Sequence, residues 1–295
     1  MTIQNLNDLR STARADVAGV AQPLRRADPK QHRLCDLHDG PADHPAAKTN
    51  SSPEPRRTDL LDSPFAHKIS AFAKLSPDDL NALSNLYRRR QKFPAGRDMI
   101  HEGQTGQAAF ILHDGWVSSY KMLANGTRKI VGIQIPGDFL GLRSILFRTA
   151  DHNVEAITPL KVSEVPRSFL LATFANAPRL ATAILWAASR DEAIVVENLV
   201  GLGRRNAGER LAHFLLELAA RLRLVGLGDN AGYACPLSQY MLADALGLSA
   251  VHVNRCLREL REENLVTFQN GQVVFQDFDK LVTFADFDGT YLDHD

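Results

Sequence analysis

The sequence predicts an α+β protein with three successive parts: an N-terminal antiparallel, jelly-roll-like β-roll, a long helix, and a C-terminal winged helix-turn-helix. Three observations lead to this prediction. Short β-leaning runs alternate with glycine turns between residues 93 and 165. A long helical pattern with two apolar stripes runs from Pro178 to about Leu202. Two helical patterns then meet at Gly247, and two strand-like runs joined by Asn270-Gly271 follow them.

The composition allows two domains with tails in 295 residues, and the formal net charge is zero. No overall positive field therefore draws the chain to nucleic acid, so DNA affinity has to come from locally placed arginines. Cys35, Cys235 and Cys256 are scattered, which is typical of a reducing cytosol and gives neither a disulfide framework nor a metal site. Because there is no long apolar run and no secretory signal, we expect a cytoplasmic protein without a membrane partner.

Residues 1–62 are rich in proline and poor in large apolar side chains, so we expect a disordered N-terminal extension. Its His32, His38 and His44 are evenly spaced, but we interpret them as histidines of a disordered tail rather than as a metal-binding tract. Ordered structure is expected to begin near Phe65.

Residues 63–177 are expected to form the β-roll domain, preceded by a helix that starts at Ser76-Pro77. A hydroxyl N-cap, a proline in the first turn and two following aspartates are typical of a helix start. The leucines at positions 80, 83 and 86 mark the buried face of that helix. Within the roll, Asn125-Gly126 predicts a hairpin with a type I′ turn.

Residues 178–205 are expected to form a dimerisation helix that ends in a hinge. One apolar stripe, with Ile184, Ala187 and Ile194, would face the roll of its own chain. The other would face a symmetry mate in an isologous homodimer. This second stripe consists of Ala181, Leu185, Ala188, Val195, Leu199 and Leu202. A helix buried within a monomer remains the alternative, and the glycines at 201 and 203 suggest the hinge.

Residues 206–285 are expected to form the DNA-binding domain, and residues 286–295 an acidic, frayed tail. The domain opens with a capping box, Asn206 to Glu209. Gly247 can end the first helix of the helix-turn-helix in the left-handed conformation, and Ser249 can cap the second.

The second helix of this module separates an apolar face from a polar one. Its apolar face is expected to consist of Val253, Cys256, Leu257 and Leu260. Its opposite face combines side chains that match guanine and adenine edges with small apolar groups that can touch a thymine methyl. The residues expected to contact bases are Arg255, Asn254, Val251 and Ala250. Those expected to contact phosphates are Ser249, His252, Gln239 and Arg258.

The order of these parts resembles the Crp/Fnr family of bacterial transcription regulators. The resemblance covers residues 65–275 and is most specific at Pro-Gly-Asp-Phe-Leu-Gly, residues 136–141, and at Leu-Ala-Asp-Ala-Leu-Gly-Leu-Ser, residues 242–249. It implies a homodimer that binds a roughly palindromic double-stranded operator, works with RNA polymerase and responds to a signal at the β-roll. By the same resemblance, Arg255 matches the base-reading arginine of the family.

The effector cassette departs from the pattern of the family's cyclic-nucleotide binders. Leu142 stands where those proteins have a glutamate, and residues 149–155 lack the arginine-serine pair that holds the cyclic phosphate. Asp151 and Glu155 would repel that phosphate. We therefore expect no cAMP binding, an unknown effector or none, and no cofactor. The residues expected around an effector are Gly137, Asp138, Phe139, Gly141, Leu142, Arg143 and Ser144.

The sequence does not favour an iron–sulfur cluster or a haem. Cys35 alone cannot hold the iron–sulfur cluster of another branch of the family. His101, His113 and His152 are candidate haem ligands, but we interpret them as ordinary surface or core histidines.

The leading functional hypothesis is a dimeric, sequence-specific transcription regulator. One alternative is a cyclic-nucleotide-responsive regulator with an altered cassette, and another is a scaffold that keeps the fold without binding DNA. An enzyme is not expected, because the sequence lacks a nucleophile elbow, a P-loop and a zinc-protease motif. The Asp-Phe-Asp-Gly-Thr run at 286–290 is interpreted as a chance likeness to a phosphatase motif.

Overall fold

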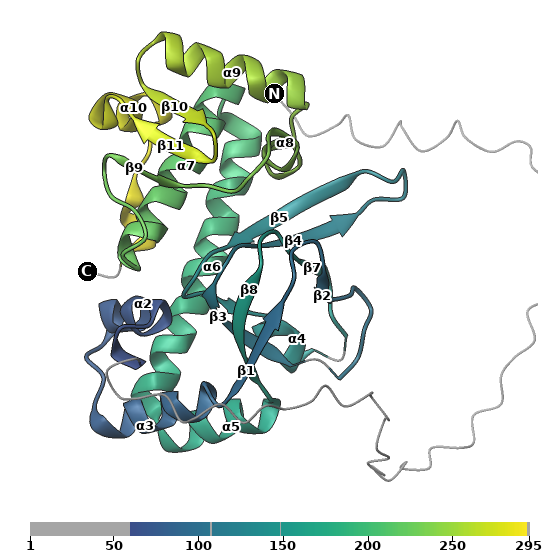
Figure 1. Cartoon of the computed structure of the whole chain (residues 1–295), viewed down its shortest axis with the longest axis vertical. Coiled ribbons are helices and arrows are strands. Elements are labelled where there is room, and N and C mark those ends of the chain that lie inside the picture. Colours follow the sequence, from purple (N-terminus) through teal and green to yellow (C-terminus); the bar gives the residue numbers. More distant parts are fainter. Residues whose placement is uncertain (1–59, 107, 148, 294–295) are drawn as a thin grey trace, which may run out of the picture. The chain divides into compact units, whose positions relative to one another are not determined.

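The computed structural model describes residues 60–106, 108–147 and 149–293 (Figure 1). The predicted extension lies almost wholly outside these ranges, together with Cys35 and the three histidines within residues 32–44. Of residues 60–62, Leu60 is buried in the hydrophobic core.

Two short helices precede the roll, α2 (Pro64–Phe72) and α3 (Pro77–Leu86). The expected start of α3 is confirmed: Ser76 Oγ accepts from the Asp79 amide at 3.2 Å, and Asp79 Oδ2 accepts from the Ser76 amide at 2.9 Å. This reciprocal capping box satisfies two amides that the helix itself cannot pair. The three leucines of α3 are buried, as predicted.

The β-roll consists of two antiparallel sheets in the described part of the chain, with strand orders β1-β8-β3-β6 and β2-β7-β4-β5. Their apolar inner faces pack on each other. The strands are β1 (Arg89–Phe93), β2 (Asp98–Ile100), β3 (Ala109–Asp114), β4 (Val117–Met122), β5 (Arg128–Gln134), β6 (Phe139–Leu140), β7 (Asn153–Ala156) and β8 (Leu160–Val165). The sequence did not predict β1, β6 and β7, because their composition is charged or their length is too short to give a two-residue period.

The β4–β5 hairpin is confirmed, but its predicted type I′ turn is wrong. Gly126 has φ +81°, whereas Asn125 does not adopt a positive φ. The Gly126 amide donates to the Leu123 carbonyl at 2.9 Å, and the Leu123 amide donates to the Thr127 carbonyl at 2.8 Å. These bonds enclose a three-residue loop in which only the glycine takes the left-handed conformation.

Three helices follow or interrupt the roll: α4 (Leu142–Leu146), α5 (Arg167–Asn176) and α6 (Pro178–Arg204). In α6, Ile184, Ala187 and Ile194 are buried against the chain's own core, as predicted. Ala181, assigned to the outer stripe, is also buried. The outer side of α6 remains apolar and open, with Leu185 53% exposed and Leu199 68% exposed.

The expected hinge glycines do not interrupt α6. The helix continues through Gly201 and Gly203, and the break comes at Arg205, which has an extended conformation. Helix α7 (Ala207–Leu224) starts directly afterwards with the predicted capping box between Asn206 and Glu209.

The C-terminal domain packs a helix-turn-helix and a small sheet around α7 (Figure 1). The sheet order is β10-β11-β9, so a short strand before the helix-turn-helix joins the predicted hairpin. The elements are β9 (Gly232–Ala234), α8 (Gln239–Leu246), α9 (Ala250–Glu262), β10 (Val266–Gln269), β11 (Gln272–Phe275) and α10 (Phe278–Ala285).

The expectation of a frayed C-terminal tail is wrong for the described residues up to 293. A 3-10 helix, η1 (Gly289–Leu292), packs against α6 and α7, and Leu292 is buried. The ring of Phe287 lies edge-on to His213 on α7, with the centroids 5.0 Å apart. Acidic residues made this segment look solvated, but its apolar side chains dock on the domain.

Within the described residues, no helix combines the length and apolarity that crossing a membrane requires.

Candidate nucleic-acid interface

Local capping fixes the helix-turn-helix. Ser238 Oγ accepts from the Met241 amide at 3.2 Å and starts α8, which ends at Gly247 with φ +66°. Ser249 Oγ accepts from the His252 amide at 3.2 Å and starts α9. The predicted glycine stop and serine cap are therefore confirmed. The short turn between the helices leaves them little freedom, so α8 sets the direction of α9.

Helix α9 divides into the two faces that its sequence indicates. Val253, Cys256, Leu257 and Leu260 are buried in the domain core. Val251, at 82% exposed, lies on the opposite face with the exposed side chains of Asn254, Arg255 and Arg258. Ala250 is half-buried and packs against the core, so it forms a smaller part of this face than expected.

Among the described residues, the side-chain partners of Arg255 lie on its own helix. Its Nη2 lies 2.8 Å from His252 Nε2, and its Nε lies 3.6 Å from Glu259 Oε1. Both members of the Arg255–Glu259 pair are more than half exposed, so the pair contributes little to stability. The guanidinium can therefore leave these partners for a base edge at small cost. His252, which is expected to contact a phosphate, contacts Arg255 in this structure.

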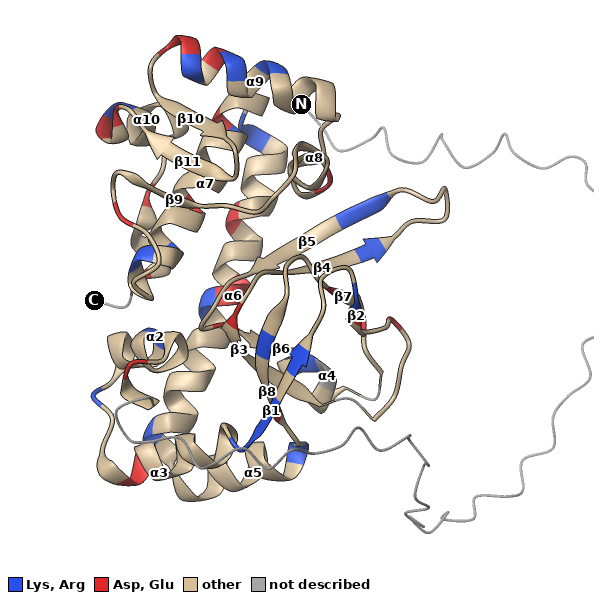
Figure 2. Ribbon diagram, viewed as in Figure 1, with Lys and Arg blue, Asp and Glu red and all other residues tan. Residues whose placement is uncertain are grey.

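The charge on α9 is mixed rather than uniformly basic (Figure 2). Arg258 lies 3.8 Å from Glu262, one turn further along the helix. The acidic side chains, from Glu259 to Glu263, occupy the C-terminal half, while the N-terminal half carries only basic and neutral groups. Because phosphates repel the acidic half, the N-terminal half is the part suited to entering a DNA groove.

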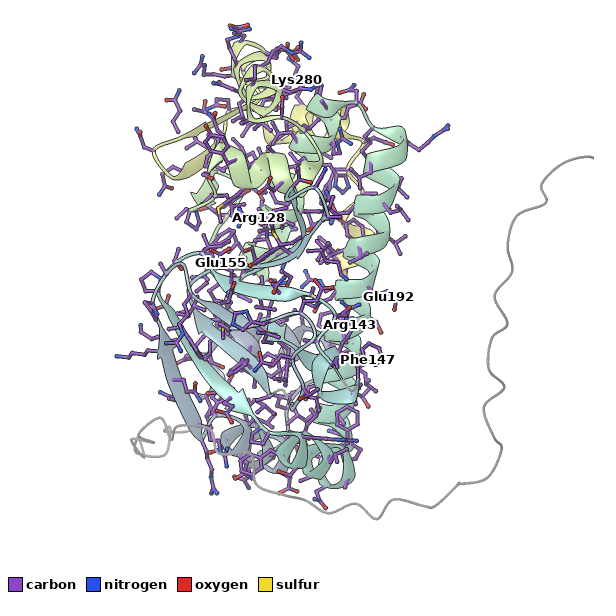
Figure 3. All side chains as sticks on the ribbon, turned by 90° about the vertical axis from the view of Figure 1, so that its right-hand side faces the viewer. Arg128, Arg143, Phe147, Glu155, Glu192 and Lys280 are labelled. Atoms are coloured by element: carbon purple, nitrogen blue, oxygen red, sulfur yellow. The ribbon has the colours of Figure 1, made fainter. Side chains whose placement is uncertain are left out.

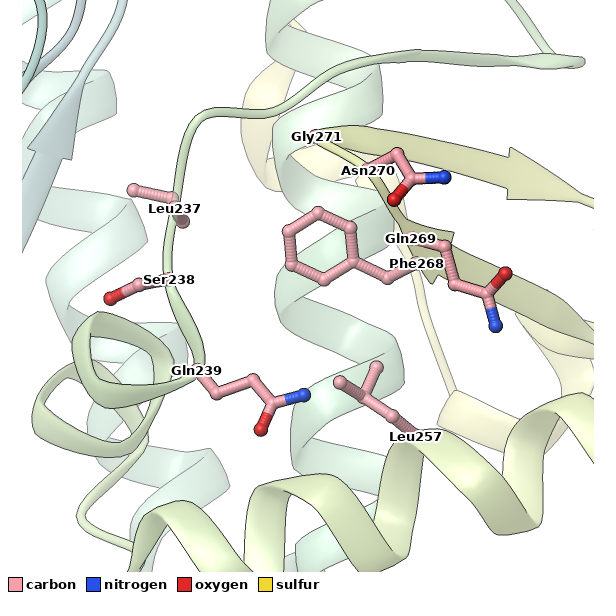
Figure 4. Close-up of a pocket in the computed structure, with 8 residues that line it drawn as sticks. All are labelled: Leu237, Ser238, Gln239, Leu257, Phe268, Gln269, Asn270 and Gly271. Carbon is pink, nitrogen blue, oxygen red and sulfur yellow. The ribbon is translucent and has the colours of Figure 1, made fainter.

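The wing confirms the predicted turn. Asn270 has φ +52° and Gly271 φ +72°, the pair of positive values that a type I′ turn requires. A concavity of about 360 Å³ lies between the wing tip, the start of α8 and Leu257 of α9 (Figure 4). Gln239 lines it together with Gln269 and Asn270 of the wing. The structure thus groups Gln239 with two wing amides, which the sequence did not predict as DNA contacts. The predicted base and phosphate contacts on α9 lie outside this group.

Three of the residues expected around an effector, Gly137, Asp138 and Phe139, contact the helices next to the roll. The Asp138 carboxylate is buried and receives Lys68 Nζ of α2 at 2.7 Å and Arg221 Nη2 of α7 at 2.9 Å. Burial alone would raise the pKa of Asp138, but the two cations outweigh it and lower the pKa to about 2. Asp138 is therefore a buried anion whose two carboxylate oxygens each accept a hydrogen bond from a cation.

The glycines of the same motif serve close packing. At Gly137, with φ +95°, a Cβ would approach the Pro64 carbonyl oxygen of α2 to 2.9 Å. Gly141, with φ +66°, precedes α4. Phe139 is buried, with its ring 5.9 Å from that of Phe65. These contacts explain the motif by packing, which sequence patterns did not indicate.

Arg143, Asp151 and His152 of the cassette form a small ion cluster at the surface. Arg143 Nη2 lies 2.9 Å from Asp151 Oδ2, and His152 Nδ1 lies 2.7 Å from Asp151 Oδ1. Leu142 is half-buried, and the side chain of Ser144 is not among those that the structure describes. Arg143 thus has a carboxylate partner from within the chain, which a cyclic phosphate would have to displace.

The three candidate haem ligands lie in different surroundings. His113 Nε2 lies 2.7 Å from Ser163 Oγ, and burial, followed by the charge of Arg90, lowers its pKa to about 4. His101 pairs loosely with Asp98 at 3.6 Å, and His152 pairs with Asp151. Among the residues that the structure describes, no three histidine, cysteine or acidic side chains gather to hold a metal.

Comparison with known proteins covers both domains. A model described as the Crp-like helix-turn-helix domain matches residues 209–284, and one described as the cyclic nucleotide-binding domain matches residues 90–177. The nitrogen fixation regulation protein FixK of Bradyrhizobium diazoefficiens is 30% identical over 190 residues, covering 64% of this chain and 78% of FixK.

A second relative and a solved structure agree with this. The transcriptional activator FnrA of Stutzerimonas stutzeri is 23% identical over 211 residues, covering 72% of this chain and 86% of FnrA. The solved structure of FixK2 from Bradyrhizobium japonicum aligns with a TM-score of 0.60 at 27% identity and covers 66% of this chain and 96% of that chain.

Proposed function

Because this chain belongs to the Crp/Fnr family of transcription regulators, we propose that it acts as a homodimer that reads a roughly palindromic DNA operator with two copies of α9. The family binds DNA through this helix-turn-helix and consists of regulators rather than enzymes. The single observation that carries the proposal is the pairing, in one chain, of an outward-facing reading helix with an uncovered apolar face on α6.

The reading helix supplies the specific contacts in this proposal. Arg255 donates a bidentate pair to a guanine, and Asn254 contacts a neighbouring base edge. Val251, the most exposed apolar residue of α9, contacts a thymine methyl. Ser249, His252, Gln239 and Arg258 bind phosphates and fix the register, which adds affinity without sequence information.

The apolar face of α6 supplies the dimer contact. Among the described residues, it presents a run of half-exposed aliphatic side chains on its outer side. These are Leu185, Val195, Val196, Leu199, Val200 and Leu202. Such a face on a long helix is typical of a partner contact, and a second copy of the same helix offers the same surface. Two-fold pairing would place two α9 helices on successive half-sites of one duplex.

The β-roll is proposed to sense something other than cAMP, or nothing. Arg143 is paired with Asp151, so it could bind a cyclic phosphate only by losing that partner, and the buried anion Asp138 would repel the phosphate. Calorimetry with cAMP and cGMP tests this point, and micromolar binding of either nucleotide would favour a cyclic-nucleotide-responsive regulator. We also propose that the protein acts in the cytoplasm and engages RNA polymerase, in keeping with the activator names of relatives such as FnrA.

The experiment that tests the proposed function is selection of bound duplexes from a random DNA pool with the full-length protein. The expected result is an enriched sequence with two inverted half-sites about one duplex turn apart. Enrichment of no sequence, with DNA binding absent at low salt, would favour the scaffold alternative. Enrichment of a single half-site would contradict the dimer.

A further inference from the structure

The β4–β5 hairpin of the roll reaches the helix-turn-helix. Strand β5 is an edge strand of its sheet, and its N-terminal end lies beside α8 (Figure 1). Two consecutive cationic residues, Arg128 and Lys129, start this strand. Both contact α8, which lies 116 residues further along the chain.

Arg128 joins three elements. Its Nε donates to Asp244 Oδ2 of α8 at 2.9 Å, and its Nη1 donates to Glu155 Oε2 of β7 at 3.0 Å. Its guanidinium lies 5.4 Å from the ring centroid of Tyr120 on β4. In Figure 3, Glu155 is labelled below and to the left of Arg128. An arginine fork with two carboxylates and an aromatic ring has a fixed orientation, which a lysine could not keep.

Lys129 holds the end of the same helix. Its Nζ donates to the Ala245 carbonyl at 2.6 Å, one of the last carbonyls of α8, which the helix itself leaves unpaired. A cation at a helix C-terminus is also favoured by the helix dipole. The contact lies next to Gly247, at the turn that directs α9. The hairpin therefore contacts α8 at two places, the Asp244 side chain and the C-terminal end of the helix.

Resting on the proposed function, we infer that Arg128 and Lys129 are positioning residues for DNA reading. They hold the helix-turn-helix at a set orientation on the roll, so that the two α9 helices of a dimer are already spaced for a palindrome. The exposed face of α9 stays free in this arrangement, with Val251 82% exposed, so the contact does not block DNA. Glu155 belongs to the effector cassette, so Arg128 also links that cassette to the reading domain.

The consequence is specific to DNA with two half-sites. A helix-turn-helix released from the hairpin samples other orientations, and apparent affinity falls with the fraction of dimers that have the right spacing. A single half-site needs only one α9 and no spacing, so its affinity does not change. This difference separates a positioning role from a role in folding the DNA-binding domain, which would weaken both.

The test uses the full chain and three duplexes: the selected palindrome, the same duplex with one half-site scrambled, and a fully scrambled duplex. The variants are Arg128→Met, which keeps an unbranched stem against Tyr120, and the near-isosteric Asp244→Asn. The matched control is Lys121→Met, which removes a cation from the same hairpin that pairs with Glu102 rather than with α8.

Each of the two variants is expected to bind the palindrome about tenfold more weakly. One partly exposed, charge-assisted hydrogen bond contributes about threefold, and a dimer contains two of them. Half-site affinity should be unchanged, and the double variant should be no weaker than either single one. Unchanged palindrome affinity, or an equal decrease on the half-site, would overturn the inference. A wild-type chain without any preference for the palindrome would overturn the proposed function as well.

Discussion

The uncovered face of α6 predicts that Leu199→Ala weakens dimerisation. Leu199 is 68% exposed in the protomer, the largest value among the aliphatic residues of this face. Burying a whole leucine side chain contributes about 1.5–3 kcal/mol, so covering this part contributes about 1–2 kcal/mol. In a two-fold interface the residue counts twice, which gives about 2–4 kcal/mol, or roughly a 30- to 1000-fold rise in the dimer dissociation constant.

Sedimentation equilibrium over a range of protein concentrations measures this constant directly. The control is Leu171→Ala, which removes a leucine that is 53% exposed but belongs to α5 rather than to the apolar face of α6. Thermal unfolding of the Leu199 variant should stay close to wild type under conditions where both proteins are monomeric, because the side chain makes little contact within its own chain. An unchanged dissociation constant, or a wild-type chain that is monomeric at every concentration, would refute the assignment of this face.

Two further predictions concern the interior. Asp138→Asn should lower the free energy of unfolding in urea by about 3 kcal/mol, because Lys68 and Arg221 lose their shared anion and keep the more distant Asp191, at 3.6 Å, and Glu217, at 3.3 Å. The folded pKa of Asp138 is about 2 and its ordinary value is 3.8. Its contribution to the free energy of unfolding is therefore present above about pH 4 and disappears as the pH falls towards 2. If the difference in stability between the wild type and the Asn variant stays constant over this range, the pairing is contradicted. Leu292→Ala should cost about 2–4 kcal/mol in thermal or urea unfolding, since Leu292 is 3% exposed, whereas a frayed tail predicts no change.

Local chemistry in the sequence was sufficient to predict the helix-turn-helix. Gly247, Ser249 and the Asn270-Gly271 pair each specify a backbone conformation by themselves, and each adopts it. The same kind of signal at Asn125-Gly126 predicted the hairpin but not its turn, because strand register decides how many residues the loop contains.

Long-range pairing could not be predicted from the sequence. Asp138 meets a lysine 70 residues before it and an arginine 83 residues after it, and no periodicity marks either one. Arg128 and Asp244 are equally remote in sequence. The C-terminal segment misled for a related reason: its acidic residues dominate the composition, while Tyr291 and Leu292 determine its packing on α7 and α6.

Sequence reading by α9 through Arg255, on which the proposed function depends, is tested most directly by an Arg255→Ala variant. The measurement is the ratio of affinities for the selected operator and for a scrambled duplex at one salt concentration, because the non-specific part varies steeply with salt. Arg179→Ala, which removes an exposed arginine from the first turn of α6, controls for the removed charge. The binding free-energy difference that corresponds to this ratio should shrink by about 1–3 kcal/mol per half-site, while the dimer stays intact. An unchanged ratio would contradict a reading role for Arg255.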